Sequence, residues 1–184
     1  MATGFQSGKY TLSHAGIFVH DLDTMVDFYT GKLGFFITDR GSAKGAEVVF
    51  LSRNPTDHHQ MALVTGRKST IEERMVQQIS FRVESLEALT KLYPIVISVA
   101  AVSDIQPVFH GVSFSLYFRD PEGNRLEFFA DTDWYVAQPC LQPLDLTLPP
   151  AQIYAEKKAY AESQPSFQPI DAWQADFERK LAHF

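Results

Sequence analysis

The residues best placed to do chemistry lie in one stretch, 113–129, with the sequence SFSLYFRDPEGNRLEFF. Alternation along a β-strand would place Glu127 between apolar neighbours, and a carboxylate in an apolar setting needs a partner such as a metal ion. Tyr117, in the preceding run, could reach the same pocket. A lone glutamate in a strand is more often solvated, so this stretch alone leaves both interpretations open.

The same stretch predicts a β-hairpin. Two runs of strand-forming residues, 114–118 and 125–129, flank a turn at 120–124 with the sequence DPEGN. Proline presets the φ angle of the first turn position, and Gly123 with Asn124 can supply a positive φ. The hairpin would therefore hold the two runs side by side, with Tyr117 and Glu127 on neighbouring strands.

Two segments predict the same order of elements. In the first, a strand, an amphipathic helix and three short strands are expected at 10–19, 22–33, 35–38, 47–52 and 60–64. In the second, a strand, a helix, another strand and the hairpin are expected at 76–83, 86–92, 95–102 and 113–129. Asp21 or Asp23 can cap the first helix, and Ser85 the second. Each segment is a β-α-β-β-β module, and two such modules are expected to pair because one cannot cover both faces of its sheet.

The pattern changes after residue 131, where prolines predict an extended arm and then two helices. Asp171 is expected to cap the last helix, whose Trp173, Phe177 and Leu181 recur at four-residue spacing. The expected domains are 1–135, with modules at about 10–66 and 75–131, and 136–184 for the arm and C-terminal helices. The apolar stripe suggests docking on the body or on a second subunit, so a homodimer is expected; the tail could also cover the pocket.

Composition argues against several classes of function. The net charge is −6 without a basic run, which argues against nucleic-acid binding through phosphate neutralisation. One cysteine, Cys140, excludes an intramolecular disulfide and a cysteine-based zinc site. The first ten residues lack the apolar core of a signal peptide, and no run reaches transmembrane length, so a cytoplasmic protein without membrane contact is expected.

The string Tyr-x-Arg-Asp-Pro-x-Gly-Asn-Arg-x-Glu, from Tyr117 to Glu127, resembles the closing hairpin of the vicinal oxygen chelate superfamily. That superfamily contains glyoxalases, bleomycin-resistance proteins and dioxygenases. The resemblance covers roughly residues 10–134 and implies an α+β fold of two paired βαβββ modules, with the C-terminal helical tail outside it. Tyr117, ahead of the Arg-Asp-Pro turn, looks specifically like the tyrosine of type I extradiol (catechol 2,3- and biphenyl-2,3-diol) dioxygenases, where it lines the catechol site.

The resemblance also implies a metal site. Extradiol enzymes bind Fe(II) through two histidines and one glutamate, and leave open positions for substrate and O2. His14 matches the first histidine and Glu127 the glutamate, whereas Gln78 stands where the second histidine is expected. An amide oxygen is a weaker donor than imidazole, although glyoxalase I uses glutamine as a ligand. The set His14, Gln78 and Glu127 implies a divalent metal, with Fe(II) or Mn(II) first and Mg(II), Zn(II) or Ni(II) as alternatives.

Besides Tyr117, two further residues are assigned by resemblance to catalysis. The segment 57–63, DHHQMAL, is similar to one in which a histidine followed by Ala-Leu three and four residues on is the acid–base group, and His59 fits that position. His110 resembles another active-site histidine, although its gap to Tyr117 is about two residues shorter than expected. Histidines 58 and 59 could also simply occupy a polar turn, and His14 could be a core histidine.

Three functions remain open from the sequence. The first is an extradiol-type oxygenase that opens the ring of a catechol-like substrate with O2, in which His59 acts as the base and His110 and Tyr117 orient the substrate or oxygen. The second is a metal-dependent lyase or isomerase on the same scaffold, which would bind metal without oxygen uptake. The third is a metal-free protein that sequesters an aromatic ligand, as bleomycin-resistance proteins do.

Overall fold

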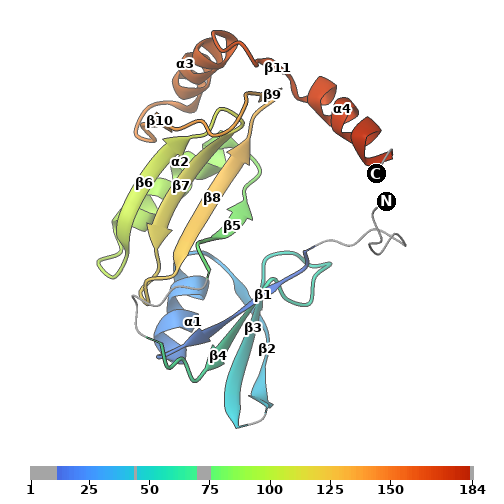
Figure 1. The fold of residues 1–184 in the computed structure, drawn as a ribbon. Coiled ribbons are helices and arrows are strands. Elements are labelled where there is room, and N and C mark those ends of the chain that lie inside the picture. Colours follow the sequence, from blue (N-terminus) through green and yellow to red (C-terminus); the bar gives the residue numbers. More distant parts are fainter. Residues whose placement is uncertain (1–11, 44, 70–75, 183–184) are drawn as a thin grey trace. The chain divides into compact units, whose positions relative to one another are not determined.

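The structure is a computed structural model that describes residues 12–43, 45–69 and 76–182. The chain divides into two compact units. Unit 1 contains residues 1–75 together with Asp120–Gly123, and unit 2 contains residues 76–119 and 124–184. Figure 1 shows the elements of both units.

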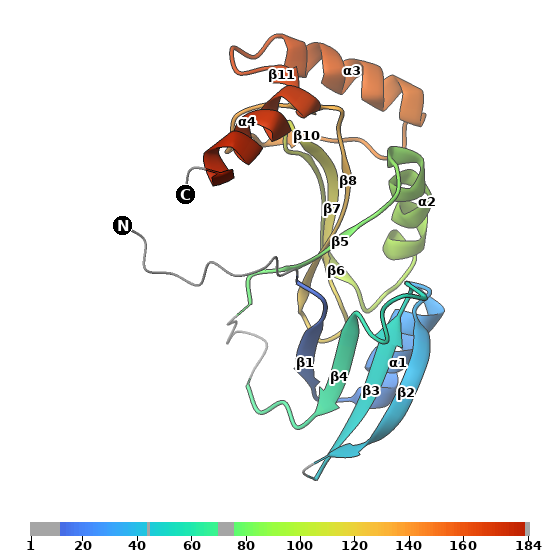
Figure 2. The same ribbon diagram turned by 90° about the vertical axis from the view of Figure 1, so that its right-hand side faces the viewer.

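Unit 1 is a βαβββ module. Its elements are β1 (Ala15–Val19), α1 (Leu22–Gly31), β2 (Phe36–Ala43), β3 (Ala46–Ser52) and β4 (Met61–Thr65). The strands form a sheet in the order β1-β4-β3-β2, in which β1 and β4 run parallel. Helix α1 covers one face of this sheet and buries its apolar side chains there (Figure 2). Asp21 caps the helix as predicted, because its carboxylate accepts a hydrogen bond from the Thr24 backbone N–H at 3.0 Å.

Unit 2 repeats the module. Its elements are β5 (Ile79–Arg82), α2 (Leu86–Ile97), β6 (Ser103–Phe109), β7 (Ser113–Arg119) and β8 (Arg125–Asp131). These strands form a sheet in the order β10-β6-β7-β8-β5, where β10 (Gln142–Pro143) is a short addition and β5 runs parallel to β8. Ser85 caps α2 as predicted, and the helix packs on β7 and β8. The predicted α+β class and the repeated module order are confirmed.

The C-terminal tail belongs to unit 2. It contains β9 (Trp134–Tyr135), α3 (Pro150–Glu162), β11 (Gln168–Pro169) and α4 (Ile170–Ala182). Helix α3 packs on α2, and its Ile153 is 2% exposed. On α4, the Trp173 ring is stacked between those of Tyr135 and Phe177, with centroid separations of 5.2 and 5.4 Å. The aromatic stripe therefore docks on unit 2 through Trp173, while Phe177 stays 47% exposed.

Three details of the sequence-based elements need correction. The strand expected at 95–102 is wrong, because α2 continues to Ile97 and β6 begins at Ser103. The run Ile-Val-Ile at 95–97 is typical of a strand, but Val96 lies two helical turns after Leu89, and both are buried on the same face of α2. The first strand begins at Ala15, and residues 10–11 lie outside the described part of the chain. Helix α4 begins at Ile170, so Asp171 lies in its first turn and does not cap it.

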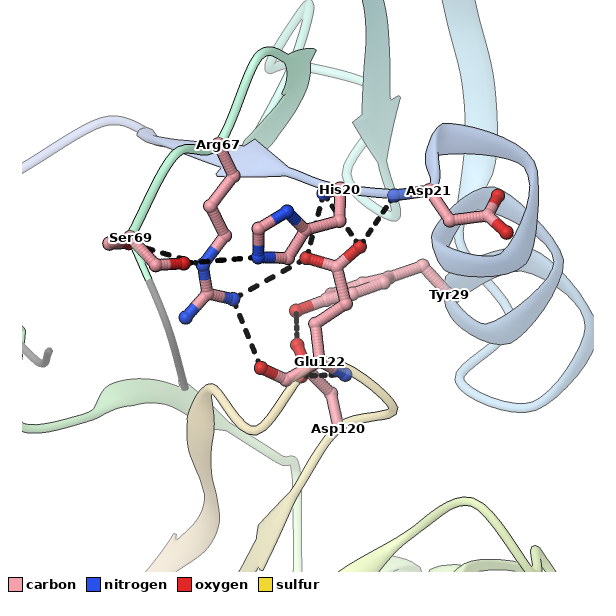
Figure 3. A network of polar contacts seen from close by, with 7 residues as sticks. All are labelled: His20, Asp21, Tyr29, Arg67, Ser69, Asp120 and Glu122. Atoms are coloured by element: carbon pink, nitrogen blue, oxygen red, sulfur yellow. Dashed lines mark hydrogen bonds and ion pairs between the residues drawn. The ribbon is translucent and has the colours of Figure 1, made fainter. Parts of the chain in front are cut away.

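The hairpin turn Asp120–Gly123 is held in unit 1 by a buried polar network (Figure 3). The Glu122 carboxylate accepts hydrogen bonds from the backbone N–H groups of His20 and Asp21, each at 2.8 Å. Arg67 forms an ion pair with Glu122 at 3.4 Å, and both side chains are 8% exposed. Tyr29 donates a hydrogen bond to Asp120 at 3.3 Å, and burial together with the Asp120 charge raises the pKa of Tyr29 well above its usual value.

None of the helices in the described ranges has the length and apolar character needed to cross a membrane.

Candidate functional site

Glu127 is the centre of a polar cluster in unit 2. It lies in the middle of β8, where strand pairing places it opposite Tyr117 of β7 on one side and Ser80 of β5 on the other. Directly paired residues point to the same face of a sheet, so these three side chains meet. Glu127 and Tyr117 are each 7% exposed, whereas Ser80 is exposed, so the carboxylate and the phenol are buried and the Ser80 side of the cluster faces solvent.

Both oxygens of the Glu127 carboxylate accept hydrogen bonds. The Tyr117 hydroxyl donates to Oε1 at 2.6 Å. The Ser80 hydroxyl and the Gln78 amide nitrogen donate to Oε2 at 2.6 and 2.7 Å. Gln78 also donates to the Ser80 hydroxyl at 2.9 Å. A carboxylate has about four lone-pair positions, so these three donors leave room for one further partner.

A hydrogen-bonded chain extends from Glu127 through Tyr117 to His110. The His110 Nε2 lies 2.9 Å from the Tyr117 hydroxyl, and its Nδ1 donates to the carbonyl oxygen of Cys140 at 3.1 Å. The Tyr117 hydroxyl is thus held between the Glu127 carboxylate on one side and the His110 ring on the other.

Tyr117 keeps its proton under ordinary conditions. Burial and the hydrogen bond to the Glu127 carboxylate raise the pKa of Tyr117 well above its usual value. The Arg125 guanidinium lies 4.6 Å from the centre of the Tyr117 ring and acts in the opposite direction, as a cation over an aromatic face. Tyr117 is thus a hydrogen-bond donor rather than an anion at neutral pH.

A second cluster lies in unit 1, at the start of two neighbouring strands. His14 precedes β1, and His59 stands two residues before β4. Because β1 and β4 are parallel and Ala15 pairs with Met61, the two starts are aligned. The rings of His14 and His59 consequently lie side by side, with centroids 4.2 Å apart. Partial burial, followed by the neighbouring His14 and His58, lowers the pKa of His59.

The predicted site residues thus form two groups. Unit 1 brings His14 and His59 together, and unit 2 brings Gln78, His110, Tyr117 and Glu127 together. Within the ranges that the structure describes, no three His, Cys, Asp or Glu side chains form a group that could hold a metal ion. The predicted ligand set includes an amide, Gln78, and its imidazole, amide and carboxylate donors fit a first-row divalent cation.

Sequence reasoning missed Ser80, which donates one of the three hydrogen bonds to Glu127. Ser80 stands two residues after Gln78, and period-2 alternation would have placed both side chains on one face of the strand. It also missed Arg125, two residues before Glu127, for which the same alternation would have been the signal.

Comparison with known proteins identifies the family of this chain. The model of the glyoxalase/bleomycin resistance protein/dioxygenase superfamily matches residues 11–128. Among solved structures, a glyoxylase/bleomycin resistance protein/dioxygenase domain from Frankia sp. EAN1pec is similar, with 21% identity and a TM-score of 0.59. The match covers 68% of this chain and 95% of that domain.

Two fosfomycin resistance proteins share the fold. FosX from Mesorhizobium loti has 20% identity and a TM-score of 0.53, over 68% of this chain and 94% of its own. A variant of FosX from Listeria monocytogenes, solved with Mn(II) and 1S,2S-dihydroxypropylphosphonic acid, has 18% identity and a TM-score of 0.52, over 72% and 95%. At these identities the solved structures establish a shared fold and nothing more. The family model, in contrast, matches well over half of the chain and therefore establishes the family. The chain belongs to the glyoxalase/bleomycin resistance protein/dioxygenase superfamily, also called the vicinal oxygen chelate superfamily.

Proposed function

We propose that this chain is a metal-dependent oxygenase that opens the ring of a catechol-type substrate next to a hydroxyl group, as extradiol dioxygenases do. Its reactants would be a small aromatic molecule with two vicinal oxygens and O2. The observation that carries the proposal is the chain of hydrogen bonds from Glu127 through Tyr117 to His110. It joins Tyr117 and His110, two of the residues that the resemblance assigns to ring-cleaving enzymes, to the buried Glu127 carboxylate.

The proposed metal ligands are His14, Gln78 and Glu127. One imidazole and two oxygen donors suit Fe(II) or Mn(II), and admit Mg(II), Zn(II) or Ni(II). When bound, the metal would supply Lewis acidity and a template on which the two substrate oxygens are oriented.

The remaining residues have separate roles in the proposal. His59 is the base that accepts a proton from a substrate hydroxyl, and its lowered pKa keeps the imidazole neutral and ready to accept near pH 7. Tyr117 retains its proton and donates it to the Glu127 carboxylate in this structure; in the proposal it turns this O–H toward an oxygen of the substrate or of O2 once the carboxylate binds the metal. His110 fixes the orientation of the Tyr117 hydroxyl from the other side.

Oxygen uptake tests this proposal. Protein loaded with Fe(II) under anaerobic conditions is mixed with catechol or biphenyl-2,3-diol, and oxygen consumption is followed together with the absorbance of the ring-opened product. Tyr117→Phe is expected to lower kcat by about 100- to 1,000-fold, because a positioned hydrogen-bond donor is lost. Tyr135→Phe, a matched change at the tyrosine stacked on Trp173, is expected to leave kcat unchanged. The proposal would be refuted if none of the named cations supported oxygen uptake. Metal binding without oxygen uptake would instead favour a lyase or isomerase.

One observation favours a second candidate, a metal-free protein that binds an aromatic ligand. The buried Glu127 carboxylate already accepts three hydrogen bonds from uncharged donors, so its burial does not require a cation. This candidate predicts the same Kd for biphenyl-2,3-diol in the presence and absence of a chelator. The oxygenase predicts weaker binding once the metal is removed.

A further inference from the structure

His59 is hydrogen-bonded to a neighbour that the catalytic scheme does not use. The Nδ1 of His58 lies 2.9 Å from the Nδ1 of His59, and the Nε2 of His58 lies 2.8 Å from the Asp39 carboxylate. Both rings pack against Phe50, with centroid separations of 5.6 Å for His58 and 4.8 Å for His59. All four residues belong to unit 1.

Hydrogen-bond accounting assigns the tautomer of each ring. The Asp39 carboxylate can only accept, so the proton of a neutral His58 is on Nε2. Its Nδ1 is then an acceptor, and the hydrogen between the two rings comes from Nδ1 of His59. A neutral His59 with its proton on Nδ1 has a bare Nε2. That nitrogen is the atom with which it could accept a proton from a substrate.

We propose that Asp39 and His58 are positioning residues, which lock His59 in the tautomer with a bare Nε2 and hold its ring in one orientation. The proposal rests on the role of His59 as base in the proposed function. An unconstrained neutral histidine exchanges between two tautomers, and only one of them presents a lone pair on the required side. The Asp39–His58 pair removes that ambiguity, and Phe50 restricts rotation of both rings.

The positions of Asp39 and His58 in the sheet explain how two exposed side chains can orient His59. Asp39 of β2 pairs with Phe50 of β3, and Phe50 pairs with Ala62 of β4, so these positions lie in one row across the sheet. The side chains of His58 and Asp39 are 57% and 67% exposed. An exposed pair contributes little to stability even when both partners are charged, so loss of either residue should change the tautomer of His59 much more than the folding of unit 1.

Nitrogen NMR of the full chain, labelled with ¹⁵N-histidine, reads the tautomer directly. Spectra are recorded at about pH 8, where histidines with ordinary pKa values are neutral, and His59→Gln identifies the His59 signals. We expect the His59 signals to show a protonated Nδ1 and a bare Nε2. A protonated Nε2 as the dominant form would overturn the proposal.

Substitutions at position 58 separate positioning from simple packing. His58→Leu removes the acceptor and is expected to let both His59 tautomers appear. His58→Asn places an amide oxygen where the ring Nδ1 was, and is expected to restore the single tautomer. Unchanged His59 signals in His58→Leu would contradict the proposal. Identical His59 signals in His58→Asn and His58→Leu would contradict it as well.

Substitutions of aspartate test the role of Asp39, the residue that accepts the hydrogen bond from His58. Asp39→Ala frees the His58 tautomer and is expected to broaden or split the His59 signals. Asp23→Ala, which removes another exposed carboxylate of unit 1, is expected to leave them unchanged. Equal effects of the two substitutions would count against a specific role for Asp39.

Kinetics gives a second readout where oxygen uptake with catechol is observed. His58→Leu is expected to lower kcat about tenfold with little change in KM, as a share of the roughly 10²- to 10⁴-fold that a positioned acid–base group contributes. A change in KM alone would contradict the proposal. The NMR result stands without activity, so failure of the proposed function and failure of this inference remain distinguishable.

Discussion

Glu122→Ala is expected to destabilise unit 1 strongly, although the residue lies in a turn. In the native structure its carboxylate accepts hydrogen bonds from the backbone N–H groups of His20 and Asp21, at the start of α1, and pairs with Arg67 (Figure 3). The substitution leaves the Arg67 side chain, which is 8% exposed, without the Glu122 carboxylate. It also removes the acceptor of the backbone N–H groups of His20 and Asp21.

The magnitude follows from burial. Removing one member of a buried ion pair costs about 3–5 kcal/mol, because the other charge keeps its desolvation penalty. Two backbone donors without their acceptor would each add about 1–3 kcal/mol in a dry site. Water entering the vacated space offsets much of that second term, so we expect a total near the first figure, about 3–5 kcal/mol.

Hydrogen exchange measured by mass spectrometry is the appropriate assay. Both tryptophans, Trp134 and Trp173, belong to unit 2, so tryptophan fluorescence does not report unit 1 directly. Amide exchange in α1 should accelerate about 100- to 4,000-fold, since each 1.4 kcal/mol is a factor of ten. Glu47→Ala, at an exposed position on β3, is the matched control and should change stability by less than about 0.5 kcal/mol. Equal exchange of α1 in the two variants would refute the reasoning.

Three further predictions concern unit 2. Gln78→His should raise the affinity for Fe(II), measured by competition with a chromogenic chelator, because imidazole is a better donor than an amide oxygen; unchanged affinity would show that residue 78 does not face the metal. Tyr117→Phe should lower the free energy of unfolding by about 1–3 kcal/mol in chemical denaturation, because the buried Glu127 carboxylate and His110 both lose a partner. The pKa of Tyr117 is about 10 in the unfolded chain and higher in the folded protein, so below about pH 10 the folded wild type keeps the whole of the resulting stabilisation. As the pH rises further, this stabilisation is lost at about 1.4 kcal/mol per pH unit. Tyr117→Phe should therefore show a shallower decline above that pH, and an identical slope in the two proteins would contradict the assignment.

Much of the site in unit 2 could be predicted because its signals are local. The turn sequence 120–124 fixes the hairpin, and strand alternation then places Tyr117 and Glu127 on one face. The module order followed in the same way from hydrophobic periodicity and from the capping residues Asp21 and Ser85.

Interactions between distant segments could not be predicted in this way. Arg67 and Glu122 are separated by 55 residues, and nothing near either one indicates a partner. Asp39 and His58 are likewise brought together only by the register of β2, β3 and β4. The end of α2 was misplaced for a different reason, since packing of Val96 against the sheet overrides the strand preference of a β-branched run.

Metal content is the most direct test of the central claim, that Glu127 is a ligand of a divalent metal. The full chain, Glu127→Gln and the control Glu84→Gln, an exposed position of unit 2, are purified anaerobically and analysed for metals with and without chelator treatment. We predict near-stoichiometric iron or manganese in the wild type and in Glu84→Gln, and none in a correctly folded Glu127→Gln. Metal retained in Glu127→Gln, or no metal in the wild type even after reconstitution, would contradict the account.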